Sequence, residues 1–267
     1  TVWLEFVPRM YLKSVQVTTD YRMGSVTFLA TVNELPKALT LRTSISFDGK
    51  PCASFETPLS AGGTIYTMQV GDVKCWDILQ PNLYDVTYEL LDGNAVIDTV
   101  QSYFGFRTVE LREHSLWLNG RPIFQRLVLD QGYYPDGVYT APTDADLKRD
   151  IELSIALGFN GARLHQKVFE ERFLYWADRL GYLVWGEQAS WGLDITTSEG
   201  LINFLPEWLE VVARDRNHPS IIGWCPFNET WDQGRRRADK RVLEAVYLTT
   251  KAADPTRPVI DTSGNYH

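Results

Sequence analysis

Polar side chains follow each of five apolar runs in the second half of the sequence. These polar ends are Asp130-Gln131, Arg163-Leu164-His165, Glu187-Gln188, Asn228-Glu229 and Asp261. The carboxyl ends of parallel strands meet at one edge of a sheet, where α/β proteins place their chemistry. Any one of these residues could be an ordinary loop residue, but five at one edge favour an active site. Carboxyl groups beside a cation would suit general acid catalysis there.

Glu229 is the strongest candidate for the catalytic acid. It follows an almost uninterrupted apolar strand and is flanked in sequence by Trp224, Phe227 and Trp231. Because apolar surroundings disfavour the charged form of a carboxyl group, they are expected to raise the pKa of Glu229. The alternative is a structural ion pair between Glu229 and Arg163, and one pocket could accommodate both roles.

Other catalytic chemistries lack their motifs. The four histidines show no HExxH or paired spacing, which gives a metal site little support. The GxSxG, phosphate-loop and GxGxxG motifs are also absent, so no cofactor is expected. Trp191 and Trp231, just beyond strand ends, are either platforms for a sugar ring or anchors of their loops.

The elements that must position these residues alternate between strands and helices after Arg107. Helices are predicted over 144–157, 170–180, around 204–212 and over 240–253, and the five strands include 122–129, 182–187 and 258–261. This alternation predicts a parallel sheet, either doubly wound or a (β/α)₈ barrel. A complete barrel takes about 250 residues, whereas 160 follow Arg107. We therefore expect an incomplete TIM barrel, with strands 1–5, over residues 108–267.

Residues 13–107 have a different periodicity. Short runs alternate between apolar and polar residues and are punctuated by Asp48-Gly49 and Asp92-Gly93. This pattern predicts about seven antiparallel strands, the number in an immunoglobulin-like β-sandwich. The fold class expected is thus multidomain, with a β-sandwich followed by an incomplete α/β barrel.

Composition excludes several classes of function. The formal net charge is −8, which disfavours a nucleic-acid partner. No apolar run approaches the length of a transmembrane helix, so no membrane partner is expected. Three cysteines are too few for a disulfide framework, although a single Cys52–Cys75 bridge stays open. Reduced thiols favour the cytoplasm, but the compartment is left undetermined.

An ordered series of motifs resembles glycoside hydrolase family 2, which contains β-galactosidases, β-glucuronidases and β-mannosidases. The motifs are YFGFR at 103–107, LWLNGRPIF at 116–124, LGFN at 157–160 and RNHPSII at 216–222, followed by Asn228-Glu229. The resemblance covers essentially the whole chain. It implies that residues 1–12 end a preceding jelly-roll domain, with an immunoglobulin-like domain and then the catalytic barrel after them.

The resemblance also implies a retaining exo-glycosidase, similar to β-galactosidases, that acts on terminal β-linked sugars. Glu229 would be the acid/base, Asn228 would bind the 2-hydroxyl of the sugar, and Arg163 would brace the site. The further sugar contacts predicted are His165, Asp130, Glu187 and Trp231. The family's nucleophile ends the seventh barrel strand, so this chain alone is expected to be inactive. A carbohydrate substrate and possible homo-oligomers are the partners implied.

Three departures from the family pattern leave the identity of the sugar open. The first strand ends in Asp130-Gln131, Arg163 and His165 are two residues apart, and Trp224–Phe227 replaces a small-residue approach to the acid. A non-catalytic carbohydrate-binding or scaffold protein with a degenerate barrel is the alternative. An aldolase-type barrel is disfavoured because the strand ends carry no lysine for a Schiff base.

Overall fold

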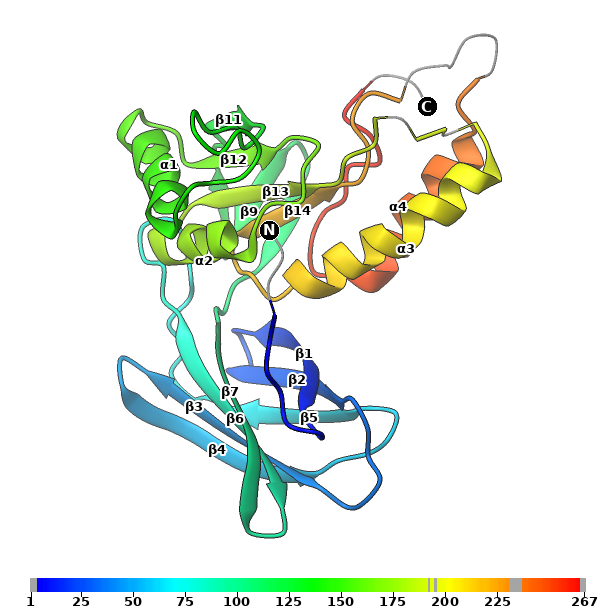
Figure 1. Ribbon diagram of the computed structural model, residues 1–267. Coiled ribbons are helices and arrows are strands. Elements are labelled where there is room, and N and C mark those ends of the chain that lie inside the picture. The colour runs from blue at the N-terminus through cyan, green and yellow to red at the C-terminus, as the bar shows by residue number, and fades with distance from the viewer. Residues whose placement is uncertain (1–3, 192, 195, 231–236, 265–267) are drawn as a thin grey trace. The chain divides into compact units, whose positions relative to one another are not determined.

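The computed structural model describes residues 4–191, 193–194, 196–230 and 237–264. The chain divides into two units, Thr1–Arg107 and Thr108–His267. The division falls where the periodicity of the sequence changes. All four helices among the described residues follow it (Figure 1).

The N-terminal unit consists of two antiparallel sheets that share one hydrophobic core. One sheet has the order β1-β2-β5 and the other the order β4-β3-β6-β7. The strands are β1 (Leu12–Asp20), β2 (Ser25–Val32), β3 (Thr40–Phe47), β4 (Lys50–Pro58), β5 (Thr64–Gln69), β6 (Tyr84–Asp92) and β7 (Ala95–Phe104). Alternate residues of β2, β3 and β5 are buried, as period-two patterning requires. Phe28, Tyr66 and Phe104 are among the rings of this core.

The C-terminal unit begins with a small antiparallel sheet and continues with a parallel one (Figure 1). The first contains β8 (Val109–Arg112), β9 (Ser115–Leu118) and β10 (Arg121–Ile123). The second has the order β11-β12-β13-β14, with β11 (Leu127–Asp130), β12 (Gly161–Leu164), β13 (Leu183–Glu187) and β14 (Ile221–Cys225). Four parallel strands alternating with helices are consistent with part of a TIM barrel.

The prediction of a single strand over residues 122–129 is wrong. This stretch divides between β10 and β11, which belong to different sheets. The side chain of Asn160 explains the break, because it accepts from the Arg126 backbone N–H at 2.8 Å and donates to the Phe124 carbonyl at 2.9 Å. Backbone groups that bond to a side chain are no longer available to continue a strand ladder.

The predicted fifth strand pairs with β14 but is shorter than expected. Its parallel contacts are two isolated bridges, Trp224↔Val259 and Phe227↔Thr262. Pro258 has no N–H to donate to a ladder, although its carbonyl accepts from Trp224 at 3.1 Å. Residues 258–263 therefore form a short fifth segment beside β14.

Four helices connect the parallel strands: α1 (Asp144–Ala156), α2 (Glu171–Leu180), α3 (Ser198–Asp215) and α4 (Lys240–Ala253). Thr143 and Asp146 form a capping box at the start of α1. Gly181 ends α2 with φ +71°, a conformation that glycine adopts without strain. No helix among the described residues is long and apolar enough to span a membrane.

The core of the C-terminal unit lies between the parallel sheet and its helices. Trp208, Trp224 and Phe227 are almost completely buried there. The Trp208 indole donates to Thr250 Oγ1 at 2.7 Å and the Trp224 indole to Asp254 Oδ2 at 2.9 Å. These bonds give each buried N–H a partner and tie α3 and β14 to α4 and its C-terminal end.

Candidate active site

The register of the parallel sheet sorts the candidate residues between its two faces. Arg163 pairs with Trp185, and Glu187 pairs with Cys225, in adjacent strands. Their sequence neighbours Leu164 and Trp224 belong to the core beneath the helices. Because side chains alternate along a strand, Arg163, Glu187 and Cys225 lie on the face opposite the helices. A cavity of about 360 Å³ opens on that face, lined by Gln125, Leu127, Arg163, Trp185, Cys225, Ile260 and Ser263.

Arg163 and Glu187 form a two-pronged ion pair. Arg163 Nε lies 2.7 Å from Glu187 Oε2, and Arg163 Nη2 lies 3.1 Å from Oε1. The Gln166 backbone N–H also donates to Oε1 at 2.9 Å. The Glu187 side chain has no exposed surface. The sequence suggested Glu187 as a sugar contact. In the structure, its buried carboxylate is bonded to Arg163 instead.

The Cys225 thiol lies beside this carboxylate. Burial, together with a smaller contribution from the negative charge of Glu187, raises the pKa of Cys225 to about 12. The thiol is thus neutral at physiological pH and behaves as part of the floor of the site.

Asn228 joins the same network from the residues that follow β14. Its Oδ1 accepts from Arg163 Nη2 at 2.7 Å and from the Ser263 hydroxyl at 3.0 Å. Its backbone N–H donates to Ser190 Oγ at 3.2 Å. The sequence analysis identified Asn228 but neither serine. The signal for Ser263 is its place two residues after the fifth apolar run, which ends in Asp261.

Glu229 is exposed and has a left-handed backbone conformation, with φ +48°. This conformation is uncommon for a residue with a side chain and often marks a functional site. Gly264 approaches closely, since a Cβ on it would come within 2.7 Å of Glu229 Cα. The chain therefore turns sharply here, which ends the strand and brings Glu229 to the surface.

The apolar enclosure predicted for Glu229 is not found among the described residues. Trp224 and Phe227 are buried in the core on the helix side of the sheet, and Trp231 lies outside the described residues. The neighbouring charges are nevertheless consistent with one site. Burial alone would lower the pKa of Arg163, but Glu187 and, to a smaller extent, Glu229 raise it above its usual value.

Comparison with known proteins identifies the family. The model of glycosyl hydrolases family 2 matches residues 10–107, and the model of the TIM barrel domain of the same family matches residues 109–265. The chain belongs to glycosyl hydrolases family 2.

Members of this family with related sequences include β-glucuronidases and β-galactosidases. A putative β-glucuronidase of Formosa agariphila is 28% identical over 86% of this chain and 29% of its own length. A β-galactosidase of Thermoanaerobacterium thermosulfurigenes is 32% identical over 76% of this chain and 28% of its own length. The chain thus spans less than a third of these relatives.

Solved structures share the fold. An FMN-binding β-glucuronidase from Facaelibacterium prausnitzii superposes with a TM-score of 0.85 at 24% identity, covering 95% of this chain and 41% of that one. A β-glucuronidase from Parabacteroides merdae superposes with a TM-score of 0.83 at 21% identity, covering 94% of this chain and 33% of that one.

The Arg163 network consists of Arg163, Glu187, Asn228 and Ser263. Not every sugar contact predicted from the sequence lies in this network. His165 is half-buried and its Nδ1 lies 3.0 Å from Gln131 Nε2. Its backbone N–H donates to the Asp130 carbonyl at 2.8 Å. Because the Gln131 amide nitrogen can only donate, it favours the tautomer in which the proton is on His165 Nε2. His165 is therefore placed at the end of β12 with a donor available.

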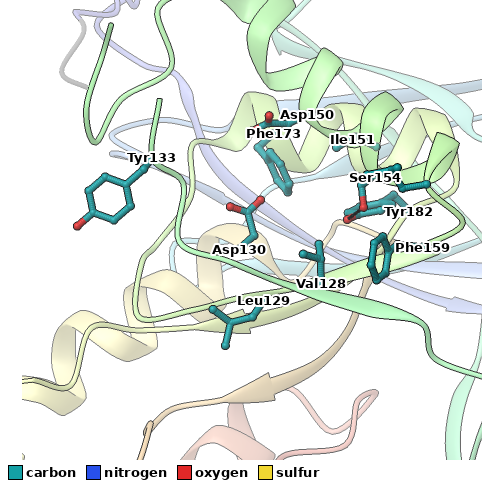
Figure 2. A pocket seen from close by; sticks show the side chains of 11 residues that line it. Val128, Leu129, Asp130, Tyr133, Asp150, Ile151, Ser154, Phe159, Phe173 and Tyr182 are labelled. Atoms are coloured by element: carbon teal, nitrogen blue, oxygen red, sulfur yellow. Dashed lines mark hydrogen bonds between the residues drawn. The ribbon is translucent and has the colours of Figure 1, made fainter. Parts of the chain in front are cut away.

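Asp130 is on the wrong face of the sheet for the predicted sugar contact. It pairs with Leu164, not with Arg163, across β11 and β12. Figure 2 shows its carboxyl group in a separate pocket together with Asp150 of α1 and Phe173 of α2. This pocket has a volume of about 270 Å³. Asp130 Oδ1 accepts from the Gly132 backbone N–H at 2.8 Å, so its evident role is to shape the loop after β11.

Of the two tryptophans considered as platforms, only Trp191 is described. It is 69% exposed, and its backbone N–H donates to Gln166 Oε1 at 3.2 Å. Gln166 in turn bonds to Glu187 through its own backbone. The exposed ring is thus connected to the Arg163 network through two hydrogen bonds. Among the described residues, no group of three histidine, cysteine or acidic side chains could hold a metal ion.

Proposed function

We propose that this chain supplies part of the active site of a retaining exo-β-glycosidase, similar to β-galactosidases. Glu229 is the acid that protonates the leaving oxygen and then the base that activates water. Asn228 donates a hydrogen bond to the 2-hydroxyl of the sugar. The observation that carries the proposal is the exposed Glu229 next to Asn228, whose amide is bonded to Arg163.

The second carboxylate of the mechanism is not Glu187. A retaining enzyme needs its two carboxyl groups about 5–5.5 Å apart, and the nucleophile must reach the anomeric carbon. Glu187 is buried and bonded to Arg163 and to the Gln166 backbone, so it has no free approach to a substrate. We infer that the nucleophile belongs to a part of the barrel outside the described residues.

We further propose an immunoglobulin-like assignment for the N-terminal unit. It is supported by two antiparallel sheets of orders β1-β2-β5 and β4-β3-β6-β7 around one core. Residues 1–12 are assigned to the end of a preceding jelly-roll domain on the family layout alone.

The proposed function is tested with the full-length gene product and aryl β-galactoside, β-glucuronide and β-mannoside. Glu229→Gln should reduce turnover about 10²–10⁴-fold for a poor leaving group, because that step needs a proton from the acid. A dinitrophenyl leaving group needs little protonation, so glycosyl transfer to the enzyme should be nearly normal. Azide should then restore turnover and yield the glycosyl azide.

Glu244→Gln is a matched control, because Glu244 is an exposed glutamate on α4. It should leave unchanged the turnover of the poor substrate, the turnover of the dinitrophenyl substrate and the turnover with azide. Normal hydrolysis of the poor substrate by Glu229→Gln would remove Glu229 from the mechanism. Sugar binding without turnover in the wild type would instead support a non-catalytic carbohydrate-binding protein.

A further inference from the structure

The orientation of the Asn228 amide is determined by its neighbours. Arg163 carries only hydrogen-bond donors, so the atom of Asn228 that faces its guanidinium must be the acceptor Oδ1. Arg163 Nη2 is 2.7 Å from that oxygen. The amide nitrogen Nδ2 therefore points away from Arg163, and no described residue makes a hydrogen bond to it.

Ser263 supplies the second donor to the same oxygen. Its hydroxyl lies 3.0 Å from Asn228 Oδ1 and 3.0 Å from Arg163 Nη2. A hydroxyl has one proton to donate and lone pairs to accept. Ser263 thus donates to Asn228 and accepts from Arg163, and both lone pairs of Oδ1 are used.

The pairing of the fifth segment with the end of β14 places this serine. Phe227 forms a parallel bridge with Thr262, and the Ser263 backbone N–H donates to the Phe227 carbonyl at 3.1 Å. Asn228 and Ser263 each follow one residue of this bridge. The Asn228 backbone is held separately by Ser190, so only the torsion of its side chain is left for Ser263 to set.

We propose that Ser263 is a positioning residue, which together with Arg163 keeps Asn228 Nδ2 directed at a hydroxyl of the bound sugar. This inference rests on the proposed function. Without the serine hydroxyl, one lone pair of Oδ1 is unpaired, and the amide, held by Arg163 alone, turns toward water in part of the molecules. The donor then meets the sugar in only a fraction of the molecules, and the hydrogen bond that strengthens in the transition state is weakened.

The kinetic test compares the preferred aryl β-glycoside with its 2-deoxy counterpart. Ser263→Ala should lower kcat for the normal sugar about three- to tenfold, the size of one ordinary hydrogen bond, with little change in KM. The 2-deoxy substrate has no hydroxyl for Nδ2, so its kcat should be unchanged. Ser263→Thr retains the hydroxyl and should restore kcat, since position 263 is exposed and has room for a methyl group.

Two further variants separate positioning from a direct contact. In an Asn228→Ala background, Ser263→Ala should have no additional effect, because the group through which it acts is missing. Ser154→Ala is the matched control. Ser154 also loses one hydrogen bond, with Tyr182 at 2.7 Å in the pocket of Figure 2, but it lies on the helix side of the sheet. Ser154→Ala should leave unchanged the ratio of kcat for the normal glycoside to kcat for its 2-deoxy counterpart.

A loss of kcat in Ser263→Ala that is equal for both substrates, or that persists in the Asn228→Ala background, overturns the inference.

Crystal structures provide an independent readout that needs no turnover. The Asn228 amide should have one orientation in the wild type and a rotated or second one in Ser263→Ala. If the wild type hydrolyses none of the glycosides, the proposed function fails. An unchanged Asn228 in the variant would still overturn positioning by Ser263.

Discussion

The two units of this chain bury different kinds of side chain. The core of the N-terminal unit is almost entirely apolar, and among its described residues the buried polar ones are Thr43, Thr64 and Arg107. The C-terminal unit buries several charged groups, among them Asp178, Glu187, Asp215, Asp254 and Arg257. The comparison shows that alternating apolar side chains are enough to build the sandwich core, whereas the buried ions of the C-terminal unit each need specific partners.

The largest effect is expected from removing one partner of the buried ion pair. Arg163→Ala leaves the Glu187 carboxylate buried without its cation, and we expect a loss of about 3–5 kcal/mol in the free energy of unfolding. Chemical denaturation followed by circular dichroism measures this loss.

Arg42→Ala is the matched control in the N-terminal unit. Arg42 also contacts two carboxylates, Glu56 at 2.7 Å and Glu89 at 3.2 Å, but on an exposed strand face. Solvent replaces such pairs at little cost. The denaturation midpoint of Arg42→Ala should therefore stay within error of the wild-type value. Equal losses in the two variants would contradict the contrast between the units.

A second buried carboxylate makes the stability of the C-terminal unit depend on pH. Asp178 accepts from the Ser220 backbone N–H at 2.8 Å and lies 2.6 Å from His218 Nδ1. Burial alone would lower the pKa of His218, but the charge and hydrogen bond of Asp178 outweigh it, and the pKa is raised. The stabilisation is therefore complete below the ordinary value of 6.5 and is lost as the pH rises through the raised pKa of the folded state.

Asp178→Asn should lower the free energy of unfolding by about 2 kcal/mol at pH 6, the size of a hydrogen bond to a charged group. The loss should shrink as the pH rises through the raised pKa of His218, because the wild type then loses the charged histidine. Denaturation curves at pH 6, 7.5 and 9 measure this, with His218→Gln as the control that removes the titrating group. A loss that is the same at all three values would exclude the pair as the source.

A smaller effect is expected from the buried hydroxyl pair of the N-terminal unit. Thr43 Oγ1 and the Tyr66 hydroxyl are 2.6 Å apart in its core. Tyr66→Phe should cost about 1 kcal/mol, because Thr43 loses a neutral partner and no charge is left unpaired. The matched control is Thr67→Val on the exposed face of β5, which removes the bond to Thr27 and should have almost no effect. A loss as large as that of Arg163→Ala would remove the distinction between the units.

The sequence predicted the elements better than the faces on which residues lie. The periodicity identified the antiparallel strands, the helices and the strand ends with Arg163 and Asn228. It could not predict that Asp130 faces α1, because a shift of one residue in a strand exchanges the two sides of the sheet. Nor could it predict the bond between Ser263 and Asn228, which depends on a pairing between residues 35 positions apart.

The half-buried carboxyl group of Asp150 on α1 is expected to destabilise the fold when it is charged. Asp150 faces the pocket of Figure 2, where burial raises its pKa, with a further increase from Asp146 and a decrease from Tyr134. A carboxyl group with a raised pKa stabilises the fold fully below its ordinary value of 3.8, and this contribution is lost as the pH rises through the raised value. Asp150→Asn removes the charge at almost constant volume, so it should raise the Tm at pH 7.

We expect the Tm of Asp150→Asn to be about 2 °C higher than that of the wild type at pH 7, and equal to it at pH 3.5. The increase corresponds to well under about 1 kcal/mol, the cost of the charge that is removed. Differential scanning calorimetry at the two pH values measures it. Asp136→Asn, at an exposed position of the loop after β11, removes the same charge and should leave the Tm unchanged. A lower Tm for Asp150→Asn at pH 7 would mean that this carboxylate stabilises the fold. The pocket at α1 would then share the property of the Arg163 network, in which a buried ion is stable because its partners are in place.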